Sequence, residues 1–267
     1  KLYYGKLFLD KHLKISGNLD NPVVEGTIKI NKDTKFTIVL PQSDPSIADR
    51  EGIVEFIDQD NPQLTETVVL EQLNSEMGIR GINASVNIEI DKEAEISIII
   101  DKANGDFIKV KGEAQLNGGI DPSGKTTLTG RYELSEGSYE MNFNGIKRKF
   151  DIKKGSYILW TGEPTTADIN ISAIYKTEAA PIDLVNDQLG TVTAEVRNTY
   201  KQKLPFETVL KMTGELMKPT ISFDIVLPEG NNTVSTEIIN TTQAKLTQLR
   251  QHPDELNKQV FALLLLN

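Results

Sequence analysis

Apolar and polar residues alternate along most of this chain. Two neighbouring runs show the pattern clearly: Ala84, Val86, Ile88 and Ile90, then Ala94, Ile96, Ile98 and Ile100. A period of two residues is typical of β-strands, because successive side chains point to opposite faces of a sheet. The alternation recurs from Val24 to Leu227. It predicts roughly a dozen strands, each with one apolar and one polar face.

Short turn signals separate many of these runs. Asn104-Gly105, Asn144-Gly145 and Lys154-Gly155 each lie between two runs, and such pairs favour tight turns. A longer phrase, with glycine first, leucine third and proline sixth, occurs at residues 17–22 and again at 214–219. Because short connections join antiparallel neighbours, the sequence predicts a long antiparallel meander.

Three stretches interrupt the alternation. Residues 58–81 include a predicted short helix at 67–74, and residues 177–204 form a long polar connection. From residue 235 to 251, glycine and proline are absent, and the apolar residues can share one helical face. A second helix is predicted to begin at His252-Pro253. We therefore expect a β-region at 1–230 and a mainly helical tail at 231–267.

Strands with one apolar face allow two architectures. In a sandwich or barrel the apolar faces close on one another, whereas in an open trough a single curled sheet keeps its inner face accessible. Aromatic residues make up only 6% of the chain, and most connections are short. We therefore predict an all-β fold: a long curled antiparallel meander that forms an open β-taco, or trough, with an apolar inner face and short C-terminal helices. An apolar face of that size needs an apolar partner, such as acyl chains.

Charge and composition narrow the classes of partner. The net charge is −9, so the chain lacks the basic surface that nucleic-acid binding requires, and no nucleic acid is expected. It has no cysteine, which excludes disulfides, thiolate metal sites and cysteine nucleophiles. No apolar run reaches the roughly 18 residues of a membrane-spanning helix. Both ends lie inside patterned segments, and we interpret the chain as a fragment of a longer polypeptide.

Candidate catalytic and metal-binding residues are few. His12 and His252 lie in polar stretches, which is typical of solvated histidines. Asp91, Glu93 and Glu95 fall on one face of a predicted hairpin, which favours a solvated surface over a cation site. No carboxylate pair stands out for glycoside hydrolysis, and a Ser-His-Asp triad lacks a suitable histidine. We predict no catalytic residues, no metal and no cofactor; an enzyme is the third hypothesis, after a protein that binds apolar ligands and an interaction module.

One segment matches the phosphate-binding loop pattern. Residues 119–126 read Gly, four residues, then Gly-Lys-Thr. That loop works only when a helix follows the lysine, since the helix N-terminus holds the phosphates. Residues 126–134 instead alternate as a strand, so we predict an ordinary hairpin turn and no nucleotide.

Several motifs, in order, resemble the C-terminal domain of the TamB family, long envelope proteins of Gram-negative bacteria that are related to AsmA-like proteins. They are the phrases at 17–22 and 214–219, the hairpin at 130–139, the segment 150–164, the strand at 168–173 and the leucine-rich end at 260–266. The likeness is densest from 112 to 230, within the β-region.

The resemblance implies a bridge-like protein of the Gram-negative periplasm that spans from an inner-membrane anchor, absent from this chain, toward the outer membrane. Its apolar groove would hold phospholipid acyl chains and support phospholipid transport to, and protein assembly in, the outer membrane. The residues we expect to line that groove are Ile96, Ile98, Val110, Leu128, Tyr132, Met141, Phe143, Trp160, Ile169, Ile171, Phe223 and Ile225.

The resemblance also implies an alternative function. In that hypothesis the chain is a structural or interaction module that carries no lipid and docks an outer-membrane barrel of the Omp85 type, TamA-like or BamA-like. Docking would support outer-membrane protein assembly or secretion, by strand addition or by helix burial. The residues expected to dock are Val260, Phe261 and Leu264.

Overall fold

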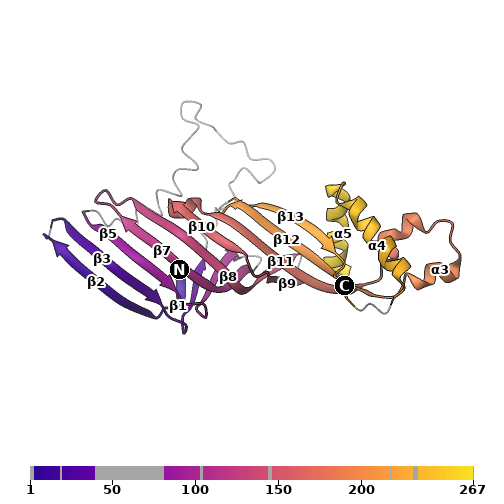
Figure 1. The fold of residues 1–267 in the computed structure, drawn as a ribbon, viewed down its shortest axis with the longest axis horizontal. Helices are drawn as coiled ribbons and strands as arrows, with labels where there is room; N and C mark the ends of the chain where they lie inside the picture. Colours follow the sequence, from indigo (N-terminus) through magenta and orange to yellow (C-terminus); the bar gives the residue numbers. More distant parts are fainter. Residues whose placement is uncertain are drawn as a thin grey trace, which may run out of the picture.

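The computed structural model describes residues 3–18, 20–39, 81–102, 105–143, 146–216, 218–230 and 234–266. Within these stretches thirteen strands form one sheet, and the helices gather at its C-terminal end (Figure 1). The expected β-fold with short C-terminal helices is confirmed, and the sheet does not close into a barrel.

The strands, in chain order, are β1 (Tyr3–Lys6), β2 (Leu9–Gly17), β3 (Pro22–Ile30), β4 (Lys35–Val39), β5 (Asn83–Ile90), β6 (Glu95–Asp101), β7 (Asp106–Ile120), β8 (Thr126–Phe143), β9 (Ile146–Ile152), β10 (Tyr157–Gly162), β11 (Asp168–Ala179), β12 (Leu204–Glu215) and β13 (Thr220–Val226). The helices are η2 (Pro164–Thr166), α2 (Ile182–Val185), η3 (Asn186–Gln188), α3 (Ala194–Thr199), α4 (Thr236–Leu249) and α5 (Pro253–Leu266). Helices α4 and α5 agree with the two helices predicted for the tail.

Two long strands, β7 and β8, run side by side through the middle of the sheet. On the other side of β7, β6 pairs with its first half and β5 with its second half. Beyond these lie β4 and β1 in one row, and β3 and β2 in the other. β8 is flanked in the same way by β9 and β10, both of which meet β11, and β12 and β13 follow. The sheet thus has two walls that share its longest strands.

The two walls meet at a line of corners, which we call the crease. Three corners of four residues, 31–34, 91–94 and 153–156, each interrupt a strand. In each, the N–H of the fourth residue donates to the carbonyl of the first, at 3.0, 2.9 and 3.2 Å respectively. The fourth residue is small or short, and it is buried in all three: Thr34, Ala94 and Ser156. At 91–94 and 153–156 the corner turns the strand while both halves stay paired with one long strand, β7 or β8. At 31–34 the two halves, β3 and β4, pair with β5 and β6.

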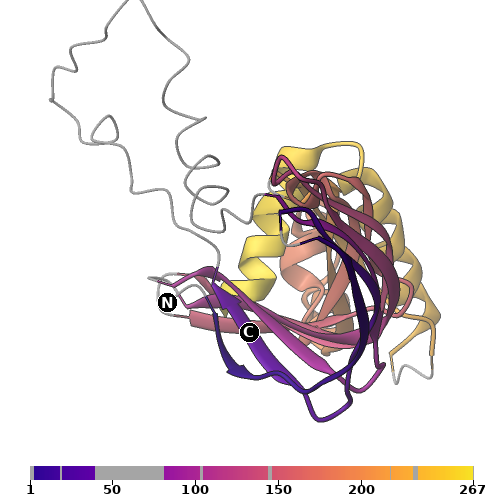
Figure 2. The same ribbon diagram turned by 90° about the vertical axis from the view of Figure 1, so that its left-hand side faces the viewer.

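The long strands cross the crease without a corner, and glycine makes this possible. The pairing of β7 with β8 shifts register after Lys111, where Gly112 pairs with Leu134. A Cβ on Gly112 would lie 2.0 Å from the carbonyl oxygen of Glu133, far closer than atoms can approach. The two backbones therefore meet where the sheet bends, and viewed along its length the sheet has a C-shaped outline (Figure 2).

Two sequence predictions about strand pairing are wrong. The turns at Asp91-Lys92-Glu93 and Lys154-Gly155 indicated hairpins, but β5 and β6 do not pair with each other; both pair with β7. Likewise β9 and β10 both pair with β8. A corner with a four-residue turn looks like a hairpin in the sequence, because both need the same turn residues.

The sheet is also mixed, whereas the sequence predicted an antiparallel meander. β3 runs parallel to β5, and β4 runs parallel to β6. Parallel neighbours need a long crossover, and residues 40–82 separate β4 from β5. The helix predicted at 67–74 lies outside the described residues. The phrases at 17–22 and 214–219 lie between antiparallel partners, β2 and β3 in one case and β12 and β13 in the other.

Candidate functional site

All twelve residues predicted to line a groove lie on one face of the sheet, which we call the inner face. The pairing register shows this directly: Ile96 pairs with Val110, Tyr132 with Ile158, and Ile158 with Ile169. On the far side, Ile171 pairs with Met212, Leu210 with Phe223 and Thr208 with Ile225. Ile98, Leu128 and Trp160 follow at even spacing from Ile96, Tyr132 and Ile158 on the same strands. Met141 and Phe143 lie beyond the register shift of β8, at even spacing from Tyr139, which pairs with Ile108. For Phe143 the structure describes the backbone and not the side chain.

The twelve residues differ in burial. Five of them belong to a packed core, namely Val110, Tyr132, Ile169, Ile171 and Ile225. Six are half-buried: Ile96, Ile98, Leu128, Met141, Trp160 and Phe223. The inner face is therefore partly filled by the protein itself, and contact of these residues with lipid stays a prediction.

At the N-terminal end of the sheet the inner face is open. On β2, Leu9, Leu13 and Ile15 pair with inner-face residues of β3, yet all three are exposed, Ile15 by 73%. Ile38 on β4 and Tyr3 on β1 are exposed on the same face. Sequence analysis did not select these residues for the groove. The signal was present, because they follow the same two-residue alternation.

At the C-terminal end the helices cover the inner face. Leu256, Val260 and Leu264 recur every four residues along α5 and are buried in the same core as the strands. The rings of Phe261 and Phe223 lie 6.2 Å apart, centroid to centroid. Figures 1 and 2 show α5 against β13, on the concave side of the sheet.

This packing bears on the three residues predicted to dock a partner. Val260 and Leu264 contact the chain's own core, while Phe261 is 36% exposed. In this arrangement only Phe261 offers surface to a partner. Docking through the other two side chains requires α5 to leave the sheet.

Two hydroxyl groups are buried on the inner face. Tyr132 Oη and Thr208 Oγ1 have no hydrogen-bond partner within the described part of the chain. Burial raises the pKa of the Tyr132 phenol above its usual range because the charged phenolate is poorly solvated there. Burial, with a smaller contribution from the charge of Asp106, also raises the pKa of Tyr139 to about 12.

One arginine also occupies an inner-face position. Arg148 on β9 pairs with Met141 and lies two residues before the fully buried Phe150. Its Nε–H donates to the carbonyl oxygen of Leu264 at 2.5 Å, in the last turn of α5. Its guanidinium carbon lies 5.6 Å from the centre of the Tyr175 ring. The Arg148 guanidinium on the inner face thus binds the partially negative carbonyl end of α5.

The sequence matches the family model of the TamB C-terminal domain over residues 3–267. The chain belongs to the TamB family. No curated protein matches it. TamB proteins are periplasmic envelope proteins, and they form a non-enzymatic module with a role in outer-membrane assembly or lipid transport. The family associates with the outer-membrane assembly machinery. None of the helices among the described residues of this TamB domain is long and apolar enough to span a membrane.

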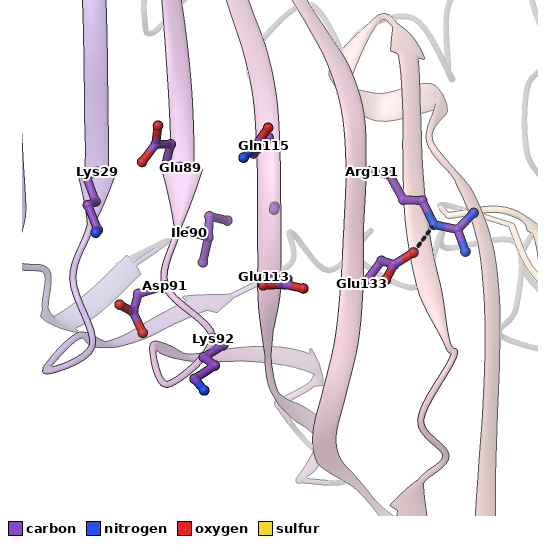
Figure 3. A pocket seen from close by; sticks show the side chains of 10 residues that line it. Lys29, Glu89, Ile90, Asp91, Lys92, Glu113, Gln115, Arg131 and Glu133 are labelled. Carbon is purple, nitrogen blue, oxygen red and sulfur yellow. Dashed lines mark hydrogen bonds and ion pairs between the residues drawn. The ribbon is translucent and has the colours of Figure 1, made fainter.

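The outer face of this TamB domain carries a charged hollow of about 630 Å³ (Figure 3). Its lining comes from β3, β5, β7, β8 and the corner after β5: Lys29, Glu89, Ile90, Asp91, Lys92, Glu113, Ala114, Gln115, Arg131 and Glu133. Arg131 pairs with Glu133 at 3.0 Å and lies 3.6 Å from the centre of the Tyr157 ring. Three basic and four acidic side chains line the hollow, and such a mixture of charges suits a hydrated surface rather than an apolar ligand.

The acidic residues near the crease do not form a cation site. Asp91 Oδ1 accepts a hydrogen bond from the Glu93 N–H at 3.0 Å and so shapes the corner. Glu93 pairs with Lys111 at 3.3 Å, and Glu95 pairs with Lys109 at 3.5 Å. No group of three potential ligands lies together within the residues that the structure describes.

The segment that matches the phosphate-loop pattern is a hairpin turn between β7 and β8, as predicted. Asp121 Oδ1 accepts from the N–H groups of Ser123 and Lys125 at 2.9 and 3.0 Å, and Gly124 has a φ of +90°. The hydrogen bond from the Ser123 hydroxyl holds the pKa of Asp121 below its usual value. A strand follows, so no helix N-terminus is present to hold a phosphate.

Proposed function

We propose that this TamB domain holds phospholipid acyl chains on its inner face and supports phospholipid transport to, and protein assembly in, the outer membrane. The observation that carries the proposal is the continuity of the inner face. It begins exposed at Leu13 and Ile15, runs through the half-buried Ile96 and Trp160, and ends in the core under α5.

The energetics favour an apolar occupant at the open end. Covering one exposed leucine or isoleucine stabilises a complex by about 1.5–3 kcal/mol. Leu9, Leu13 and Ile15 on β2 and Ile38 on β4 are such side chains. Acyl chains gain about 0.8 kcal/mol for each buried methylene group. No catalytic step, metal or cofactor is part of the proposal.

A test is to purify the chain from bacterial membranes and to identify the extracted lipids by mass spectrometry. Ile15→Asp places a carboxylate on the open apolar face, and we expect roughly tenfold weaker lipid retention. Ser16→Asp is the matched control, because Ser16 lies next to Ile15 but on the other face. The same amount of lipid in both variants and the parent chain, or none in any of them, contradicts the proposal.

The second candidate function is a docking module for an outer-membrane barrel of the Omp85 type, without carried lipid. Its support is that β13 pairs only with β12 within the described residues, and that Phe261 beside it is 36% exposed. An unpaired strand edge can accept a strand from a partner. A photo-crosslinker at position 261 that captured lipid and no barrel protein would count against this candidate.

A further inference from the structure

Helix α5 fills part of the inner face in a manner that resembles a bound lipid. Its apolar stripe of Leu256, Val260 and Leu264 is buried against the core, and Phe261 lies on Phe223. Its C-terminal carbonyl end lies at Arg148, through the 2.5 Å hydrogen bond to the oxygen of Leu264. The last carbonyls of a helix have no partner within the helix and carry its partial negative charge.

A glycerophospholipid has the same two features, an apolar body and a negative end. Arginine is the side chain best suited to a phosphate, because its planar fork donates several hydrogen bonds at once. We propose that α5 is an intramolecular occupant of the lipid path, and that a phospholipid takes its place with its phosphate at Arg148. This inference rests on the proposed function and adds the lipid's site and orientation at the C-terminal end.

The two helices of the tail are held differently. α4 is tied by polar contacts: Lys245 pairs with Asp187 at 2.5 Å, and Arg250, directly after α4, pairs with Asp224 at 2.8 Å. The charged residues of α5 form no ion pair among the described residues; they are Asp254, Glu255 and Lys258. An acyl chain can replace apolar contacts but not ion pairs. α5 is therefore the helix that lipid displaces, turning about the link at 250–252, while α4 stays in place.

The experiment locks α5 in place. The chain has no cysteine, so the double variant Phe223→Cys with Phe261→Cys can be joined specifically by a short thiol crosslinker. The probe is dioleoyl phosphatidylglycerol with a photoreactive group in its acyl chain, and labelled peptides are mapped by mass spectrometry. With the crosslink absent, we expect labelling of β11 to β13 as well as the open end. With the crosslink formed, labelling of β11 to β13 is lost and that of β1 to β4 remains.

Arg148→Gln tests the phosphate contact, and Lys147→Gln is its matched control, since the neighbouring Lys147 is exposed on the outer face and loses the same charge. The readout is the preference for phosphatidylglycerol over dioleoylglycerol, which has no phosphate. We expect Arg148→Gln to lower that preference about tenfold and Lys147→Gln to leave it unchanged. Inorganic phosphate alone is expected to leave the rate of thiol crosslinking between positions 223 and 261 unchanged, because phosphate has no apolar body to displace α5.

Each contrary outcome has a distinct meaning. Labelling of β11 to β13 that persists in the crosslinked protein, or that is absent even without the crosslink, overturns the inference and leaves the proposed function standing. If Arg148→Gln and Lys147→Gln show the same preference for phosphatidylglycerol over dioleoylglycerol, the role of Arg148 is overturned. If inorganic phosphate slows the thiol crosslinking, the requirement for a lipid is overturned. Absence of labelling anywhere in the chain overturns the proposed function and this inference together.

Discussion

The two ends of the sheet carry the same alternating pattern but treat their apolar faces differently. At the N-terminal end, Leu13 and Ile15 on β2 are exposed. At the C-terminal end, Leu210 and Ile225 on β12 and β13 are buried beside the helices. Alternation decides which face is apolar, but it does not decide what covers that face. The cover is supplied by α5 at one end, and by no described residue at the other.

The largest expected effect compares the same substitution at the two ends. Leu210 is 1% exposed and Leu13 is 40% exposed. Leu210→Ala should lower the free energy of unfolding by about 2–5 kcal/mol, because it leaves a cavity in the core. Leu13→Ala should change it by less than about 0.5 kcal/mol. Urea denaturation of both variants measures the difference, and equal losses would show that the open end is packed in solution.

The next effect concerns the crease, where the two walls of the sheet meet. Gly112→Ala forces a Cβ against the Glu133 carbonyl, 2.0 Å away, whereas a Cβ on Gly162 meets no atom within 4 Å. We expect Gly112→Ala to destabilise the fold by about 1–3 kcal/mol, and Gly162→Ala to change its stability by less than about 1 kcal/mol. Thermal unfolding of the two variants tests this. Similar stability for both would mean that the strands do not approach so closely.

A smaller effect compares a hydroxyl on the sheet with one in the helical region. Tyr132→Phe removes a buried hydroxyl without a partner in the described residues and should stabilise the fold by up to about 1 kcal/mol. Tyr200→Phe removes a hydroxyl that donates to Thr241 Oγ1 at 3.3 Å and should destabilise it by about 1 kcal/mol. Calorimetry that gave both variants the same sign of change would contradict the assigned environments.

The smallest effect is on the pH dependence of the free energy of unfolding, and it is absent at neutral pH. In the folded chain the pKa of the Tyr139 phenol is raised to about 12. In the unfolded chain the same phenol loses its proton near the ordinary pKa of about 10. Its contribution to stability is complete below pH ~10 and is lost as the pH rises to about 12. Tyr139→Phe should flatten this alkaline decline. Denaturation curves measured across that pH range give the slopes.

Much of the architecture could be predicted from the sequence. Alternation gave the strands and the face on which Val110, Tyr132 and Ile171 lie, and the absence of glycine and proline indicated α4. These are local signals, set by neighbours along the chain. The resemblance of ordered motifs to the TamB family is borne out by the family model over 3–267.

The remaining features depend on contacts between distant residues. The parallel pairing of β3 with β5 joins strands that are separated in the sequence by β4 and by residues 40–82, and no local pattern encodes it. The capping of α5 by Arg148 joins positions 116 residues apart. In the sequence Arg148 is one of several basic residues, and alternation with Phe150 and Ile152 could place it on the inner face, but no local pattern indicates its contact with α5.

The line of corners lets the trough grow along its length. Thr34, Ala94 and Ser156 close equivalent four-residue turns on different strands, so the same bend recurs as strands are added. A chain with more strands of this kind would continue the crease without a new kind of turn. The distance over which apolar side chains line the inner face is therefore set by the number of strands rather than by their length.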